Sequence, residues 1–122
     1  MTYDTMNTML LNRFPELTDK IETEIDWWKG KKIPTYPLYE GVLNGSRFLV
    51  DLLTHESNLE LIGRVFDFFE EMAESDDFEV KNLLQVGILE YLWGTTLLDV
   101  AHKYMRPQTR KLSDELQIYF NP

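Results

Sequence analysis

Two helical patterns of apolar residues, over 59–73 and 78–93, constrain the fold more than any other feature of this chain. In the first, apolar residues form two adjacent rows at helical spacing, which predicts a helix with a wide buried face. In the second they leave only a thin polar side, which predicts the most buried helix. Gly87 lies in its middle, where glycine costs about 1 kcal/mol relative to alanine, so we expect a close helix crossing there. The two helices should form a hairpin over 58–93 with the proportions of a HEAT repeat.

Capping residues mark the start of both helices. Ser57 and Glu60 fit a capping box, in which a hydroxyl and a carboxylate satisfy each other's free backbone N–H groups. Asp76 and Glu79 fit a second box, and Asp77 is a further candidate cap. The hairpin is therefore expected to begin and turn at defined positions.

Helical spacing recurs along the rest of the chain, and the alternation typical of strands is nearly absent. The further helices predicted from this spacing cover approximately 4–14, 16–29, 38–54, 97–104 and 108–119. Asp4 is expected to cap the first, and Pro15 suits the start of the second. Short turns favour antiparallel neighbours. We predict an all-α fold, a single domain of six or seven antiparallel helices over 1–122.

Length and composition are those of an ordinary globular domain. The chain has 122 residues, of which 43% are hydrophobic and 27% charged, so global disorder is not expected. Because there is no cysteine, disulfides and thiolate metal sites are excluded. No apolar run approaches the roughly 20 residues that span a bilayer, and the start of the chain does not resemble a secretory signal. We expect a soluble, cytoplasmic protein without a membrane partner.

The formal net charge of −9 is the main global clue to function. An anionic chain repels nucleic acid backbones and acidic membrane surfaces, and it attracts basic proteins. Complementary charge mainly accelerates encounter and suppresses wrong partners. Acidic composition also serves solubility alone. The charge therefore argues against a nucleic acid partner and favours a basic protein, without identifying it.

Catalytic and cofactor-binding motifs are absent from the sequence. It has no Gly-x-Ser-x-Gly, no phosphate-binding glycine loop and no His-Glu-x-x-His, so we expect neither an enzyme nor a cofactor. His55 follows Asp51 by four residues, and His102 follows Asp99 by three. Two such pairs could hold a metal if their helices faced each other. A surface histidine beside a carboxylate is far commoner, so we assign no metal ligand.

A run of carboxylates at the turn of the hairpin is the first candidate binding surface. Its members are Glu70, Glu71, Glu74, Asp76 and Asp77. The spacing of a calcium-binding loop is absent. Capping and solubility explain such residues without a partner, and we predict that they contact one as well.

A second candidate surface lies on the helix predicted over 16–29 and consists of Glu22, Asp26 and Trp27. Trp28 continues a buried stripe, so the adjacent Trp27 points about 100° away from it. Exposed aromatic residues beside acidic groups are typical of interface hot spots. Packing of Trp27 under the loop at 30–37 is an equally good interpretation.

Several segments of the chain carry a resemblance to other proteins. They are Arg13-Phe14-Pro15-Glu16-Leu17, Trp27-Trp28, FDFFEEMAESDDFEVKNLLQVGILE over 66–90, and Tyr104-Met105-x-Pro-x-Thr109. These segments, which span most of the chain, resemble a family of small all-helical bacterial proteins of unknown function. Such proteins look like the cognate immunity proteins of contact-dependent or polymorphic toxin systems. The resemblance implies binding of a partner rather than catalysis, and no functional residue carries over from it.

Charge and resemblance together favour an immunity-type inhibitor. Its acidic helical face would dock onto a basic toxin domain and neutralise it. If the target is a nuclease, the carboxylates would take the place of phosphates in its cleft. The alternatives are a helical scaffold or oligomerisation module, and a small metal-binding helical protein. We expect a monomer or weak dimer.

Overall fold

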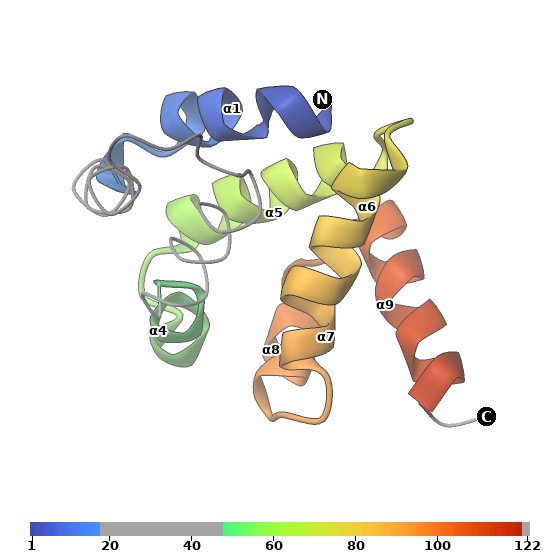
Figure 1. Ribbon diagram of the computed structural model, residues 1–122. Coiled ribbons are helices and arrows are strands. Elements are labelled where there is room, and N and C mark those ends of the chain that lie inside the picture. Colours follow the sequence, from blue (N-terminus) through green and yellow to red (C-terminus); the bar gives the residue numbers. More distant parts are fainter. Residues whose placement is uncertain (18–47, 121–122) are drawn as a thin grey trace, which may run out of the picture.

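The computed structural model describes residues 1–17 and 48–120, which form an all-α fold (Figure 1). Its elements are the 3-10 turn η1 (Tyr3–Thr5), α1 (Met6–Arg13), the 3-10 turn η2 (Pro15–Leu17), α4 (Phe48–His55), α5 (Leu59–Ala73), α6 (Phe78–Leu84), the π-helical turn η4 (Gln85–Leu89), α7 (Glu90–Leu92), α8 (Leu97–Tyr104) and α9 (Pro107–Phe120). α6, η4 and α7 follow one another without a break. The described residues thus hold six helices and no strand, which confirms the all-α prediction.

Within residues 1–17 and 48–120, the positions of the predicted helices agree with the structure. Helices appear at 59–73, 78–92, 97–104 and 107–120, close to the predicted bounds. The helix predicted over 16–29, and most of the one over 38–54, lie outside the described residues. No helix in the described ranges combines the length and the apolar character needed to cross a membrane.

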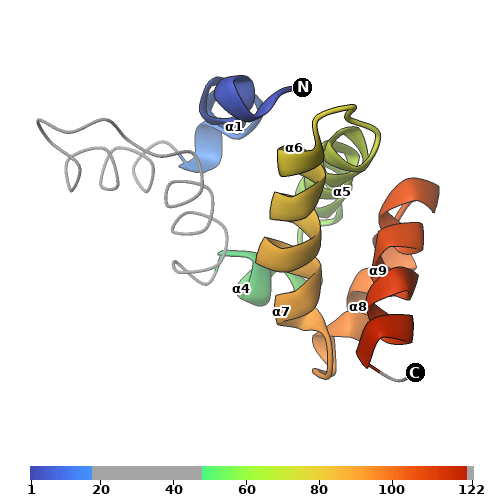
Figure 2. The ribbon, with the colours of Figure 1, turned by 45° about the vertical axis from the view of Figure 1, so that its right-hand side comes forward.

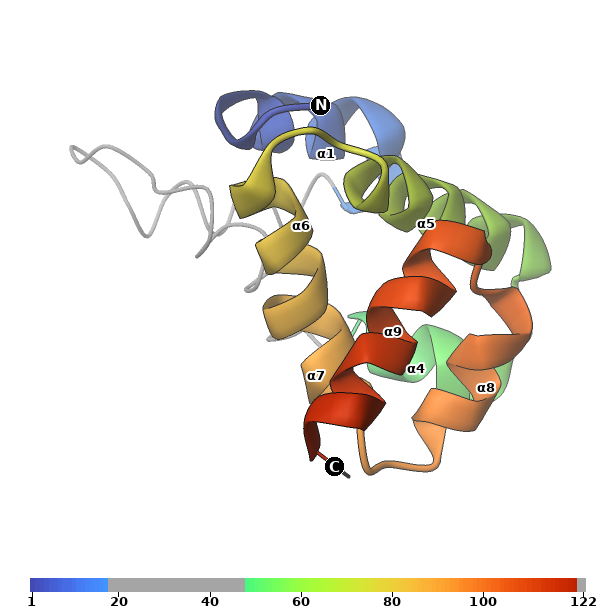
Figure 3. The same ribbon diagram turned by 90° about the vertical axis from the view of Figure 1, so that its right-hand side faces the viewer.

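α5 is the central element of the fold. α1 lies along one side of it and α4 lies near its start (Figures 1 and 3). The continuous helix α6–η4–α7 leaves the end of α5 at a steep angle. α8 then runs in the opposite direction to α6–α7. α9 reverses again and runs in the same direction as α6–α7 (Figure 3). Both helices of the hairpin predicted at 58–93 are therefore present, but the steep angle between them differs from the side-by-side packing of a HEAT repeat. They pack on α9 through α5 and η4.

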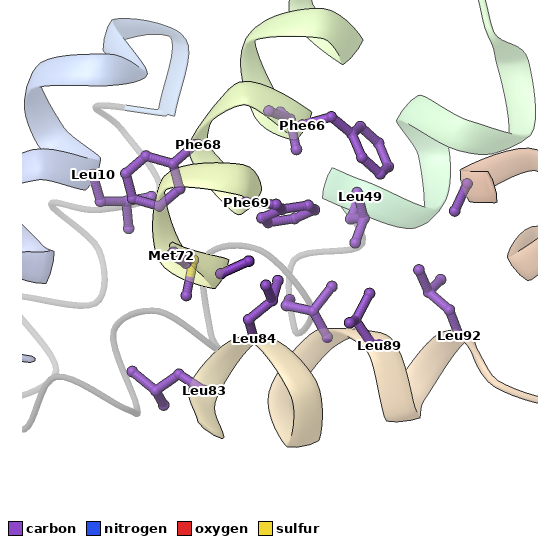
Figure 4. Packing of buried hydrophobic residues seen from close by; sticks show 14 of the residues in the cluster. Leu10, Leu49, Phe66, Phe68, Phe69, Met72, Leu83, Leu84, Leu89 and Leu92 are labelled. Atoms are coloured by element: carbon purple, nitrogen blue, oxygen red, sulfur yellow. The ribbon is translucent and has the colours of Figure 1, made fainter. Parts of the chain in front are cut away.

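Aromatic residues of α5 form the middle of the core. Phe66, Phe68 and Phe69 are fully buried. Phe68 meets Phe14, which follows α1, edge to face with ring centroids 5.5 Å apart, and Phe66 meets Phe69 at 5.3 Å. Such edge-to-face pairs are favoured over face-to-face stacking. Leucines of the α6–α7 helix face these rings from the opposite side (Figure 4).

The wide buried face predicted for α5 is confirmed. Its buried residues are Leu61, Ile62, Val65, Phe66, Phe68, Phe69, Met72 and Ala73. Of the two predicted rows, only Leu59 is exposed. A face this wide lets one helix pack against α6, α8 and α9, while α1 lies along its side and is linked to it through Arg13 and Glu71.

The start of α5 differs from the predicted capping box. Asn58, rather than Ser57, is the N-cap: its Oδ1 accepts a hydrogen bond from the N–H of Leu61 at 3.1 Å. Glu60 does not reach back to the backbone, because Arg64 donates to its carboxylate at 2.7 Å. Asparagine and serine are nearly equally favourable at the N-cap. The residue types alone therefore could not decide between Ser57 and Asn58.

Two other predicted caps also change. Asp77 caps α6, with Oδ1 accepting from the N–H of Glu79 at 3.0 Å, so the box from Asp76 is wrong. Asp4 does not cap the first helix, because a 3-10 turn precedes α1 and Thr5 is the N-cap residue. Asp76 and Asp4 are both exposed.

The π-helical turn sets which side of the α6–α7 helix is buried. The buried row recurs every four residues: Val80, Leu84, Ile88 and Leu92. In a straight α-helix such a row drifts by about 40° at each step. A turn in which the N–H of Glu90 bonds to the carbonyl of Gln85 unwinds the helix and keeps the row facing the core. α9 packs on this turn, where Gly87 is buried.

The α6–α7 helix also has exposed apolar residues. Tyr91 is 54% exposed and Val86 48%, and Phe78 at the start of the helix is 76% exposed. The sequence pattern placed Val86 and Tyr91 in the buried stripe. The helix predicted to be the most buried thus presents three large apolar side chains to solvent, and α5 is the better-buried helix.

Candidate functional site

The turn between α5 and α6 brings the predicted acidic residues to one corner of the molecule, beside the N-terminus (Figures 1 and 2). A depression of about 410 Å³ lies there, lined by Met1, Thr2, Glu71, Glu74, Ser75, Asp76 and Asp77. The carboxylates of this corner fall into two groups. Glu70, Glu71 and Asp77 bond to other parts of the chain, whereas Glu74 and Asp76 point outward.

Glu70 caps another helix. One of its carboxylate oxygens accepts hydrogen bonds from the N–H of Thr109 at 2.8 Å and from the Thr109 hydroxyl at 2.9 Å, and the other accepts from the N–H of Gln108 at 2.9 Å. These N–H groups belong to the first turn of α9, where backbone donors lack helical partners and the helix dipole favours an anion. Both oxygens of Glu70 are therefore engaged within the molecule.

Glu71 is held by Arg13 at the end of α1. The guanidinium makes a two-pronged contact with the carboxylate, with Nη2 2.7 Å from Oε1. The hydrogen bond to Glu71 raises the pKa of Arg13 above its ordinary value. Because the side chains are 37% and 41% exposed, the pair is partly solvated and adds little to stability. It neutralises one of the predicted contact residues.

Asp77 fastens the N-terminal segment to the turn. Its Oδ2 accepts from the N–H of Tyr3 at 2.8 Å, while Oδ1 caps α6. Ser75 supports the same junction: its hydroxyl donates to the carbonyl of Met1 at 2.7 Å and accepts from the N–H of Asp77 at 3.1 Å. The turn is thus held in one conformation by bonds on both sides.

The outward group consists of Glu74, Asp76 and Glu79, which are exposed and make no ion pair with a described residue. Phe78, 76% exposed, lies between Asp76 and Glu79 in the sequence. We call these four residues the exposed acidic patch. Phe78 was not identified from the sequence as part of a surface. A signal was present, because Phe78 directly follows the cap Asp77 and precedes the buried row that begins at Val80.

Other acidic residues along the exposed side of α5 are neutralised by basic side chains. Arg64 Nη2 lies 2.6 Å from Glu16 and 2.7 Å from Glu60, and its hydrogen bond lowers the pKa of Glu16. Arg106 pairs with Asp67. The exposed stripe of α5 is therefore less anionic than its sequence suggests, whereas the carboxylates of the exposed acidic patch are not neutralised by a described residue.

The second predicted surface, Glu22, Asp26 and Trp27, lies outside the described residues. The two histidines do not come together with enough carboxylates for a metal: residues 1–17 and 48–120 contain no group of three or more His, Asp or Glu that could hold an ion. His102 Nε2 lies 3.2 Å from the hydroxyl of Ser113, and burial lowers the pKa of His102. His102 therefore serves the packing of α8 on α9.

Comparison with known proteins places the chain in a family but does not give it an activity. No curated protein and no solved structure matches the chain. A family described as a domain of unknown function, DUF7674, matches residues 7–121, and the chain belongs to this family.

Proposed function

We propose that the protein is a non-enzymatic, immunity-type inhibitor that acts in the cytoplasm. It binds a cognate basic toxin domain through the exposed acidic patch and neutralises it. The observation that carries the proposal is that Glu74, Asp76 and Glu79 are all exposed and lie within five residues of the exposed Phe78 along the chain. An aromatic anchor beside charged groups is a common composition of interface hot spots.

The internal bonds of the corner support this role. Glu70, Glu71 and Asp77 bond to α9, α1 and the N-terminal segment, and so hold the turn in place. A surface that is already ordered loses less conformational entropy on binding than a mobile one. We infer that these three residues position the patch, while the outward carboxylates contact the partner. This divides the five acidic residues predicted from sequence into two roles.

The resemblance to immunity proteins supports a toxin as the partner. If that toxin is a nuclease, its cleft is basic because it receives phosphates. Fixed carboxylates on a rigid turn would occupy those phosphate positions and exclude the nucleic acid. Long-range attraction would also accelerate the encounter.

The proposal predicts protection of cells that express a toxin. A basic C-terminal toxin domain encoded beside this chain's gene is produced in a test bacterium, with and without this protein. We expect growth to be restored by the wild type and reduced by the double variant E74Q/D76N. Measured in vitro at low salt, that variant should associate about threefold to tenfold more slowly, because two attractive charges are lost.

A matched variant controls for net charge. Glu90 and Asp99 are exposed and lie on other helices, so E90Q/D99N removes the same charge away from the patch. It should leave the association rate within about twofold of wild type. Failure of the wild type to protect against any adjacent basic domain, or equal rates for the two double variants, would refute the proposed interface.

A helical scaffold or oligomerisation module is a second candidate, which one observation favours. Val86 and Tyr91 are spaced by five residues across the π-helical turn and are both exposed. Exposed apolar groups on one side of a helix are typical of a protein interface. Sedimentation velocity separates the two candidates: a dimer that Tyr91→Ser dissociates supports the scaffold, and a monomer removes it.

A further inference from the structure

A groove of about 280 Å³ lies between the α6–η4 segment and α9, beyond the end of α5. The two helices stand beside each other there (Figure 3). Phe78, Lys81 and Gln85 contribute to one wall, and Lys111, Leu112 and Glu115 to the other. Gln85 Nε2 donates to the carbonyl of Leu112 at 3.2 Å and links the walls. The groove is therefore bounded by regular, mutually bonded elements.

The two lysines of this groove differ from the other basic side chains that the structure describes. Each of the others makes an ion pair: Arg13 with Glu71, Arg64 with Glu16 and Glu60, Lys103 with Glu56, Arg106 with Asp67, and Arg110 with Asp114. Lys81 and Lys111 make none among residues 1–17 and 48–120. In a chain of net charge −9, the two lysines of the described part that make no ion pair thus line the same groove.

The groove also has an apolar part. Phe78 is 76% exposed, and Leu112 is half-buried on the facing helix. Backbone and amide groups supply further polar contacts, because Asn82 and Gln108 lie in the same lining. A ligand that satisfies all of these groups carries negative charge and an apolar side chain in an extended stretch of a few residues.

We propose that this groove binds an acidic peptide segment of a protein partner, with carboxylates on Lys81 and Lys111 and an apolar side chain against Phe78 and Leu112. Charge complementarity carries the proposal. It does not depend on the proposed function, since the groove attracts the opposite charge from the exposed acidic patch. The acidic segment can belong to a toxin or to another protein.

The overall negative charge limits this binding without preventing it. Repulsion between separated charges is screened beyond about 8 Å at physiological ionic strength, whereas contacts with the two lysines act at much shorter range. Association should therefore be slow at low salt and accelerate as salt is added. Glu115 repels a carboxylate at its end of the groove, so removal of its charge should strengthen binding.

The test uses two blocked hexapeptides of sequence Glu-Glu-Leu-Phe-Glu-Glu and Gln-Gln-Leu-Phe-Gln-Gln. Each is titrated to about 1 mM into the isotope-labelled full chain, and amide shifts are followed by NMR. We expect the acidic peptide alone to shift the amides of Lys81, Gln85 and Lys111. The variant K81Q/K111Q should weaken binding about tenfold, because two charge-assisted contacts are lost. E115Q should tighten it about twofold to threefold.

Two further variants separate this groove from general charge effects. K103Q/R106Q removes the same net charge from ion pairs outside the groove and should leave the affinity within about twofold. E74Q/D76N, which disables the exposed acidic patch, should not weaken peptide binding. This result keeps the test independent of toxin neutralisation.

Several results would overturn the proposal. They are no shift at the highest peptide concentration, shifts on another surface, equal binding of the neutral peptide, or equal losses for K81Q/K111Q and K103Q/R106Q. Inorganic phosphate provides the last comparison. If it shifts the groove amides and fully prevents the peptide from doing so at equal concentration, the site takes small anions only and the peptide assignment is wrong.

Discussion

Glu70 shows how one side chain can join two helices that are distant in sequence. It lies in the last turn of α5 and accepts three hydrogen bonds from the first turn of α9, which begins at Pro107. Proline at the first helical position has no N–H to satisfy, so the free donors are those of Gln108 and Thr109. Glu70 satisfies both, and Thr109 is fully buried beside it.

Removal of this carboxylate should destabilise the protein. We expect Glu70→Ala to lower the free energy of unfolding by about 1–2 kcal/mol, because α9 loses its cap and a buried hydroxyl loses its acceptor. Urea denaturation at neutral pH measures the change. Glu74→Ala, one helical turn along and exposed, should stay within about 0.5 kcal/mol of wild type. Equal effects of the two substitutions would show that Glu70 does not act as a cap.

The sequence could not distinguish the two kinds of acidic residue at this corner. The partners of Glu70, Glu71 and Asp77 lie 39, 58 and 74 residues away along the chain. Local patterns hold no information on such contacts. Sequence reasoning therefore located the acidic corner correctly but could not separate the carboxylates that hold the turn from those that face outward.

At the scale of the element, the α6–α7 helix explains both a success and an error of prediction. Its existence and ends follow from capping residues and apolar spacing. Its exposed side does not, because Tyr91 follows Leu84 by seven residues, about two turns of a regular α-helix, and would share its buried side. The π-helical turn η4 holds one residue more than an α-helical turn, because its hydrogen bond spans five residues. The extra residue rotates Tyr91 to solvent, where it is 54% exposed. Packing of α9 on η4, a tertiary contact, accompanies this turn.

This register can be tested by substituting neighbouring residues. Leu92 is fully buried, so Leu92→Ala should lower the free energy of unfolding by about 2–4 kcal/mol through lost apolar contact and a cavity. Tyr91→Ala should change it by less than about 1 kcal/mol, since Tyr91 is 54% exposed. Chemical denaturation of both variants gives the comparison. A larger loss for Tyr91→Ala would indicate a regular α-helix at this point.

At the scale of the molecule, opposite charges are distributed unequally. Five of the seven lysine and arginine side chains in residues 1–17 and 48–120 pair with acidic ones, and the remaining two line the α6–α9 groove, whereas the carboxylates of the exposed acidic patch are unpaired within these ranges. Phe78 belongs to both surfaces, because it is part of the exposed acidic patch and also lines the groove. A partner with a basic segment next to an acidic one could contact the exposed acidic patch and the groove at the same time.

The net charge also predicts how stability depends on salt. The chain carries a formal charge of −9, so its acidic residues repel one another over long distances. Raising the ionic strength from about 0.01 M to about 0.15 M shortens the Debye length from about 30 Å to about 8 Å, which screens this repulsion but weakens contact ion pairs much less. The ion pairs among the described residues are partly exposed and individually contribute little. We therefore expect the free energy of unfolding, measured with urea, to rise by on the order of 1 kcal/mol over this range.

Charge variants give the sign of this effect independently. E74Q/D76N removes two repelling charges and should reduce the response to salt. Arg110→Gln removes a positive charge and breaks the pair with Asp114, whose N–O distance is 3.0 Å, so it should increase the response. If stability instead falls as salt is added, the contact pairs outweigh the long-range repulsion. The exposed acidic patch would then contribute less to the salt dependence of stability than the paired residues of α5 and α9.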